Sequence, residues 1–64
     1  MKRNDLIRHI LANGCVFERE GAKHSVFFNP RLNKSSTVPR HNEIHNWLAD
    51  KICKDLGIKS LNKK

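Results

Sequence analysis

The stretch from Gly21 to Phe28, which reads Gly-Ala-Lys-His-Ser-Val-Phe-Phe, constrains the fold of this chain more than any other. A glycine turn passes here into an apolar segment, and this pattern predicts a strand from about Lys23 to Asn29. His24 lies where the turn becomes the strand, beside Lys23. A side chain at that point has a fixed position and one open side.

Side chains alternate between the two faces of a strand. His24, Val26 and Phe28 therefore share one face of the expected strand. Ser25 and Phe27 share the other face, so both faces are partly apolar. We expect one face to pack on helices and the other to be covered by a partner, because exposed apolar patches on small soluble proteins usually mark contacts.

Two further segments predict strands before and after this one. The apolar run at residues 15–17 leads into Glu18-Arg19-Glu20 and then Gly21, which is typical of a strand followed by a turn. A third strand is expected over residues 35–38, and Pro39 ends it because proline cannot donate to a β-ladder. Short loops join the three strands, so we expect an antiparallel meander.

Apolar residues at helical spacing predict one helix before the strands and another after them. The first helix is expected over residues 5–12, with Asn4 as its N-cap. The second is expected to have Asn42 as its N-cap and Glu43 in its first turn. Gly57 is expected to end it, since glycine readily adopts the left-handed conformation that follows many helices.

The order helix, three strands, helix predicts a two-layer α+β domain in which two helices cover one face of the sheet. We expect a single domain over residues 1–64. Ile58 and Leu61 are expected to fold back on the body, and Lys63-Lys64 to form a frayed basic end. Double-stranded-RNA-binding domains have this element order, so RNA is the first polyanion to consider.

The chain is strongly basic, with 13 Lys and Arg against six Asp and Glu and a net charge of +7. Such a charge costs self-repulsion within the fold, and it most often serves a polyanionic partner. The charged first residues and the lack of a long apolar run predict a cytoplasmic protein that does not contact the membrane. The basic residues that we expect to contact RNA are Lys2, Lys23, Lys34, Arg3, Arg31 and Arg40.

The sequence offers little for metal chemistry. Cys15 and Cys53 are typical of free thiols in a reducing cytosol, and no Cys and His spacing resembles a zinc site. His41 and His45 are four residues apart, but no third ligand is evident. The six carboxylates form no clustered pair of the kind that a two-metal nuclease needs. We therefore expect no metal and no cofactor.

RNA can be cleaved without metal because it carries its own nucleophile, the ribose 2′-hydroxyl. Imidazole both accepts and donates a proton near neutral pH. If His24 removes the 2′-hydroxyl proton, the oxygen can attack the adjacent phosphorus, which gives a 2′,3′-cyclic phosphate and a free 5′-hydroxyl. The alternative is that His24 is a surface histidine without a functional role. For His41 we prefer packing or a hydrogen bond at the entry of the second helix over catalysis.

Three motifs together resemble the HicA-type toxins of bacterial toxin–antitoxin pairs: Gly-Ala-Lys-His at 21–24, Asn-Pro at 29–30 and Thr-Val-Pro-Arg-His at 37–41. The resemblance implies a fold like that of double-stranded-RNA-binding domains and ribosome-independent cleavage of mRNA. It also implies neutralisation by a HicB-type antitoxin encoded beside the toxin. The family's single catalytic histidine falls on His24, and its Val-Pro-x-His element falls on residues 38–41.

We therefore expect the toxin of a type II system, a metal-independent mRNA endoribonuclease with His24 as general acid and base. A HicB-type antitoxin is expected to cover His24 and the sheet face bearing Val26 and Phe28. The first alternative is a non-catalytic RNA-binding module of the same fold, which would read duplex shape and phosphates. A helical DNA-binding protein is the weakest alternative, because three strands are predicted and no helix-turn-helix pattern is present.

Overall fold

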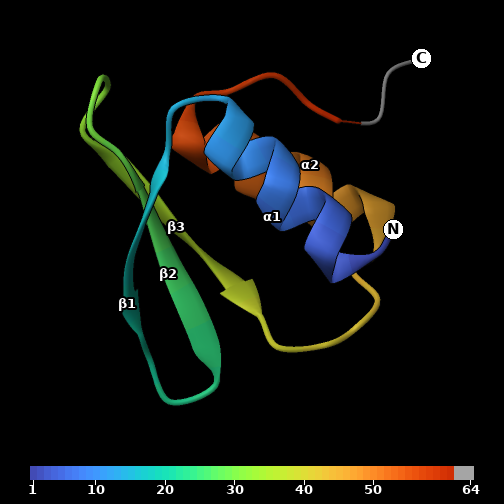
Figure 1. The fold of residues 1–64 in the computed structure, drawn as a ribbon. Helices are drawn as coiled ribbons and strands as arrows, with labels where there is room; N and C mark the ends of the chain where they lie inside the picture. The colour runs from blue at the N-terminus through green and yellow to red at the C-terminus, as the bar shows by residue number, and fades with distance from the viewer. Residues whose placement is uncertain (62–64) are drawn as a thin grey trace.

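A computed structural model describes residues 1–61 of the chain. The elements, in chain order, are α1 (Arg3–Ala12), β1 (Val16–Glu20), β2 (His24–Asn29), β3 (Lys34–Pro39) and α2 (Asn46–Leu56). The strands form one antiparallel sheet in the order β1-β2-β3, with β2 in the centre (Figure 1). This confirms the predicted α+β fold, which has the α-β-β-β-α order of double-stranded-RNA-binding domains.

The two faces of the sheet are not equivalent, and contacts from β2 show which face the helices cover. Ser25 is hydrogen-bonded to Arg3 of α1, and Asn29 is hydrogen-bonded to Leu56 of α2. Phe27 lies between them on the same face and is 3% exposed. The core around it consists of Leu6, Ile10, Cys15, Val38, Ile44, Ala49, Ile52, Cys53 and Leu56. Both helices therefore pack on one face and leave the opposite face without a helix.

β1 is longer than the apolar run at residues 15–17, because it continues through the charged residues to Glu20. A bulge between Phe17 and Arg19 shifts its pairing with β2. The carboxylate of Glu20 accepts a hydrogen bond from the Ser25 hydroxyl on β2 (Oγ to Oε1, 2.9 Å). The charged side chain of Glu20 therefore has a hydrogen-bond partner, Ser25, on the neighbouring strand.

α1 begins at Arg3, with Lys2 as its N-cap, so the expected cap at Asn4 is wrong. The first turn of a helix leaves backbone N–H groups without partners inside the helix. Here the Arg3 N–H donates to the carbonyl oxygen of Asn42, at 2.9 Å. The Asn42 carbonyl oxygen, far along the chain, therefore satisfies this N–H group in place of a capping side chain.

α2 begins at Asn46, so the expected N-cap at Asn42, with Glu43 in the first turn, is wrong. The segment before α2 is used to hold the N-terminus of the chain. Glu43 forms an isolated antiparallel β-bridge with Lys2. The next residue, Ile44, is 2% exposed and belongs to the core. Residues 42–44 therefore pair with the first residues of the chain and do not join α2.

The C-terminal end of α2 is held by β2 and by the loop between β2 and β3. Gly57 ends the helix with a φ of 74°, as predicted. A Cβ at that position would lie 2.5 Å from Cδ1 of Leu32, so the exposed Leu32 side chain would have to move to admit it. Asn29, which is 1% exposed, donates from Nδ2 to the Leu56 carbonyl oxygen at 2.8 Å. Its own Oδ1 accepts from the Arg31 N–H at 3.0 Å.

The tail after α2 follows the expected course as far as the structure describes it. Ile58 and Leu61 are partly buried, and Ile58 packs against the core. The expected basic end at Lys63-Lys64 lies outside the described residues. Neither helix within residues 1–61 has the length and apolar character that a membrane span requires.

Candidate active site

His24 is held firmly by its backbone and is exposed at its side chain. It is the first residue of β2 and pairs with Pro39 of β3. Its carbonyl oxygen accepts a hydrogen bond from the Gly21 N–H at 2.7 Å, which closes the turn between β1 and β2. Lys23, in that turn, is exposed as well. The imidazole of His24 is therefore open to solvent at the end of the central strand.

A hollow of about 680 Å³ opens beside His24. Its lining includes three histidines that are apart in the sequence: His24, His41 and His45. His41, for which packing or a hydrogen bond at the entry of the second helix was preferred, is exposed in the loop after β3 and belongs to the same hollow. His45 is the N-cap of α2 and not a residue within the helix. The complete lining consists of His24, Pro39, His41, Asn42, Glu43, Ile44, His45 and Leu48.

One signal in the sequence could have linked His41 to His24. The strand that begins after the Gly21–His24 turn and the strand that ends at Pro39 are expected neighbours in a meander. Antiparallel pairing of β2 with β3 sets His24 opposite Pro39, so the second residue after Pro39 must lie near the His24 end of the sheet. The pairing register, however, is settled only by the folded structure.

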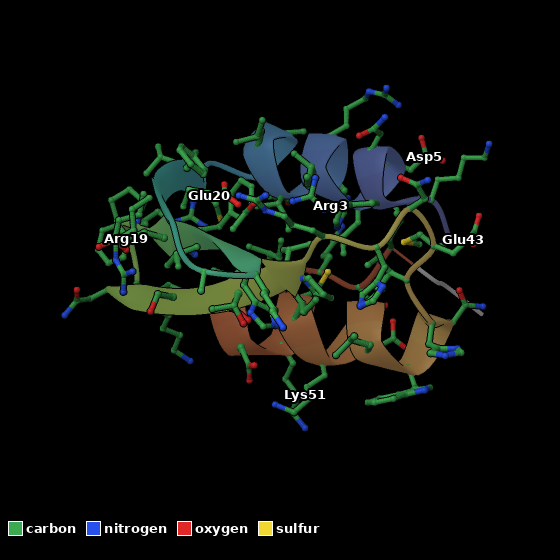
Figure 2. All side chains as sticks on the ribbon, turned by 90° about the horizontal axis from the view of Figure 1, so that it is seen from below. Arg3, Asp5, Arg19, Glu20, Glu43 and Lys51 are labelled. Atoms are coloured by element: carbon green, nitrogen blue, oxygen red, sulfur yellow. The ribbon has the colours of Figure 1, made fainter. Side chains whose placement is uncertain are left out.

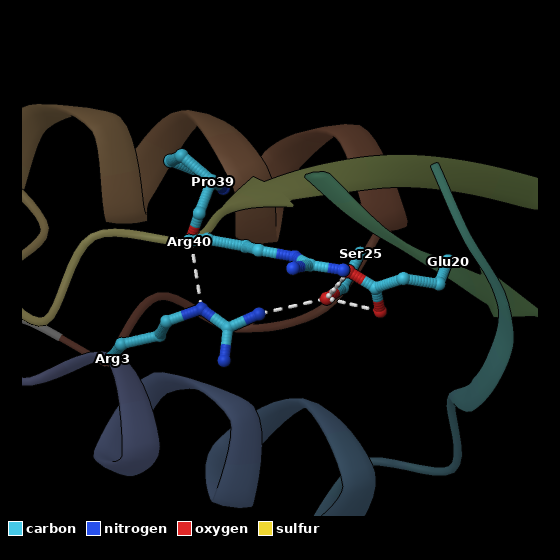
Figure 3. Close-up of polar contacts among 5 residues, drawn as sticks. All are labelled: Arg3, Glu20, Ser25, Pro39 and Arg40. Carbon is cyan, nitrogen blue, oxygen red and sulfur yellow. Dashed lines mark hydrogen bonds and ion pairs between the residues drawn. The ribbon is translucent and has the colours of Figure 1, made fainter. Parts of the chain in front are cut away.

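A polar network lies next to this hollow, between α1 and the sheet (Figure 3). Arg3 donates from Nε to the Pro39 carbonyl oxygen at 2.8 Å and from Nη2 to the Ser25 hydroxyl at 2.7 Å. The Ser25 hydroxyl donates to Glu20, which also forms an ion pair with Arg40. The hydrogen bond from Ser25 and the nearby guanidinium groups of Arg40 and Arg3 hold the pKa of the Glu20 carboxyl below its usual value.

The network lines a second hollow, of about 610 Å³, which shares Asn42 and Glu43 with the hollow at His24. Lys2 also lines this second hollow and is exposed. The two hollows are therefore adjacent parts of one surface at the His24 end of the sheet, and the second hollow is the more polar of the two. Because Glu20 is ionised there, it offsets part of the positive charge that Arg3 and Arg40 bring.

The structure divides the six expected RNA-contacting residues into two groups. Lys2, Arg3, Lys23 and Arg40 lie around the His24 end of the sheet. Of these, Arg3 points inward from α1 (Figure 2), where its guanidinium group donates hydrogen bonds to Ser25 and Pro39. Arg40 forms an ion pair with Glu20.

Arg31 and Lys34 lie at the opposite end of the sheet from His24. Lys34 begins β3 and pairs with Asn29, the last residue of β2. Arg31 lies in the loop between these strands. The length of β2 separates the two ends by about 17 Å. These two cations therefore lie apart from the four around His24.

Neither a metal cluster nor a reactive thiol is evident in the part of the chain that the structure describes. Residues 1–61 contain no group of three or more His, Cys, Asp or Glu side chains that could hold a metal ion. Cys15 and Cys53 are free and buried. Burial raises the pKa of both thiols, which disfavours the thiolate that nucleophilic catalysis requires.

Comparison with protein families gives a match that covers most of the chain. Residues 3–58 match the family described as the HicA toxin of bacterial toxin–antitoxin systems. The matched range contains both helices, all three strands and the whole lining of the hollow at His24. No curated protein and no solved structure matches the chain.

Proposed function

Since the chain belongs to the HicA toxin family, it is the toxin of a bacterial toxin–antitoxin system, and we propose that it is a metal-independent endoribonuclease that cleaves mRNA in the cytoplasm. The observation that carries this proposal is the position of His24. Its imidazole is exposed in a hollow, on a backbone held by the central strand and a closed turn, in a chain with a net charge of +7.

The reaction needs a proton acceptor at the ribose and a proton donor at the leaving oxygen. His24 accepts the proton of the 2′-hydroxyl as that oxygen attacks the adjacent phosphorus. The bond from phosphorus to the 5′-oxygen breaks, and the protonated imidazole returns its proton to that oxygen. Lys23 and Lys2 supply positive charge for the phosphate oxygens, which stabilises the charge that develops on them. The products are a 2′,3′-cyclic phosphate and a 5′-hydroxyl.

The wild-type protein tests this proposal directly. In the presence of EDTA it is expected to cleave a single-stranded RNA and to leave DNA of the same sequence intact, because DNA lacks the 2′-hydroxyl. The ends of the products are identified by their reactivity: a cyclic phosphate resists phosphatase until acid opens it, and a 5′-hydroxyl accepts phosphate from a kinase. RNA that is bound but not cleaved would favour the non-catalytic RNA-binding module. Cleavage that requires added Mg²⁺ would contradict the metal-free mechanism.

We also propose that the partner is a HicB-type antitoxin, which covers His24 and the face of the sheet bearing Val26 and Phe28. This face carries no helix, and Phe28 is only partly buried. Phe28 pairs with Val16, which is 47% exposed, so together they form an apolar contact surface. Val26 is 9% exposed and adds little to it. Antitoxin carboxylates that face Lys2 and Lys23, at the His24 end of the sheet, would assist association.

The variant Phe28→Lys is expected to weaken antitoxin binding by about tenfold to a hundredfold, since it places a charge at the centre of an apolar contact. Isothermal titration of the antitoxin into the variant measures the loss. Leu11→Lys is the matched control, because Leu11 is 47% exposed on α1, away from this face. Equal affinity of Phe28→Lys and the wild type would show that the antitoxin binds elsewhere.

A further inference from the structure

We propose that the paired rings of His45 and Trp47, at the start of α2, form a binding site for an unpaired nucleobase of the RNA. The site adjoins the hollow that contains His24, and it depends on RNA being the ligand, as proposed above. It would hold a base close to the reacting phosphate and thereby orient the strand at His24.

The exposure of Trp47 is the first observation. Trp47 is the only tryptophan of the chain, and 65% of it is exposed. A large aromatic side chain normally contributes to the core of a domain this small, because its burial is strongly stabilising. Here the core is filled without it, so its surface is available for a ligand.

The geometry of the two rings is the second observation. The imidazole of His45 and the indole of Trp47 are nearly parallel, with an interplanar angle of 14° and a centroid separation of 6.1 Å. Their faces therefore have a common orientation. Unpaired bases stack on aromatic faces of this kind, and the interaction is tolerant of sequence because every base has a π-face.

The surroundings of Trp47 favour a nucleobase over a protein partner. The residues one turn further along α2 are Asp50 and Lys51, and both are exposed. Lys51 points away from the body of the protein on the outer side of α2 (Figure 2). Lys51 is ion-paired with Asp55 at 3.3 Å, so it leaves no free positive charge beside Trp47. Contiguous exposed apolar patches larger than several hundred Å² mark protein contacts, whereas a stacked base needs only one aromatic face. The other large exposed apolar side chains lie outside α2: Leu11, Val16, Phe17 and Leu32.

The position of His45 connects this platform to the proposed chemistry. His45 lines the hollow with His24 and stacks on Trp47, so it belongs to both sites. A strand whose phosphate lies at His24 can place a neighbouring base on the platform. Loss of the platform should therefore weaken RNA binding and raise KM while the chemistry at His24 remains.

Trp47 itself reports on the test. The chain has one Trp and no Tyr, so its ultraviolet fluorescence above 300 nm comes from Trp47, and a base stacked on the indole quenches it. The probe is a single-stranded 2′-O-methyl oligoribonucleotide, which lacks the nucleophile and cannot be cleaved. We expect this probe to quench the emission on binding. An abasic oligonucleotide of equal length, which offers only phosphates, should bind more weakly and leave the emission nearly unchanged.

Variants separate stacking from other effects. Trp47→Ala should reduce affinity for the probe by about fivefold to a hundredfold, measured by fluorescence anisotropy of an end-labelled probe, and Trp47→Phe should retain most of it. The thermal midpoint should change little, because Trp47 is mostly exposed. Leu11→Ala, which removes an exposed apolar side chain from α1, is the control and should bind as the wild type does.

Two results would overturn the platform: equal quenching by the abasic probe, or an unchanged affinity of Trp47→Ala for the oligonucleotide. Loss of antitoxin binding alone in Trp47→Ala would assign the ring to a protein interface. The platform and the proposed nuclease function can fail separately. Base-dependent quenching without any cleavage of RNA would support the platform and contradict the nuclease function. RNA cleavage together with an unchanged affinity of Trp47→Ala would support the nuclease function and contradict the platform.

Discussion

Replacing His24 by alanine is expected to reduce RNA cleavage by about 10²–10⁴-fold, the contribution typical of one general acid or base. The fold should survive, because the side chain is exposed and β2 is held by its backbone pairing with both neighbouring strands. Initial rates on a single-stranded RNA in EDTA measure the loss. A circular-dichroism melt of the same preparation verifies that the variant is folded.

Two other histidines serve as controls for this result. His9 lies on α1, outside the hollow, and its Nε2 is hydrogen-bonded to the Lys59 carbonyl oxygen. His9→Ala should therefore cleave RNA at the wild-type rate. His41 lines the hollow, so His41→Ala tests whether one imidazole is enough. A loss in His41→Ala as large as that in His24→Ala would contradict the single-histidine mechanism, and equal rates for His24→Ala and the wild type would remove His24 from it.

The second large effect concerns stability. Phe27→Ala is expected to cost about 3–5 kcal/mol of unfolding free energy, through lost burial and the cavity left behind. Phe27 is 3% exposed on the central strand, on the face that both helices cover. The whole stability of a domain this small is on the order of 5 kcal/mol. The variant should therefore be largely unfolded or close to it at 25 °C, which urea titration followed by far-ultraviolet circular dichroism measures.

The neighbouring residue supplies the matched control. Phe28 has the same side chain and lies on the same strand, but it points to the face without a helix and is only partly buried. Phe28→Ala should cost clearly less than Phe27→Ala. Equal losses in the two variants would mean that both faces of the sheet are packed to the same degree, against the arrangement described here.

Much of the fold could be predicted from local patterns. The alternating segment predicted a strand from about Lys23 to Asn29, and β2 runs from His24 to Asn29. Gly57 was expected to end the second helix, and it does so in the left-handed conformation that glycine adopts readily. Both patterns reflect preferences of the residues themselves, which act whatever the rest of the chain does.

The starts of both helices were predicted wrongly, and for one reason. Asn4 and Asn42 have side chains that suit an N-cap, but the chain pairs Lys2 with Glu43 and satisfies the Arg3 N–H with the Asn42 carbonyl oxygen. These contacts join segments about 40 residues apart in the sequence. A local capping preference, worth about 1 kcal/mol, does not decide the outcome against such pairing.

The sequence by itself therefore determined the element order, the alternation of β2 and the exposed end of that strand where His24 lies, because each depends on neighbouring residues alone. Only the tertiary structure decided that His41 and His45 lie with His24 in the lining of one hollow. It also decided that Arg3 is bound within the fold. These outcomes depend on contacts between distant segments, and the free energy of such contacts arises only once the chain has closed around its core.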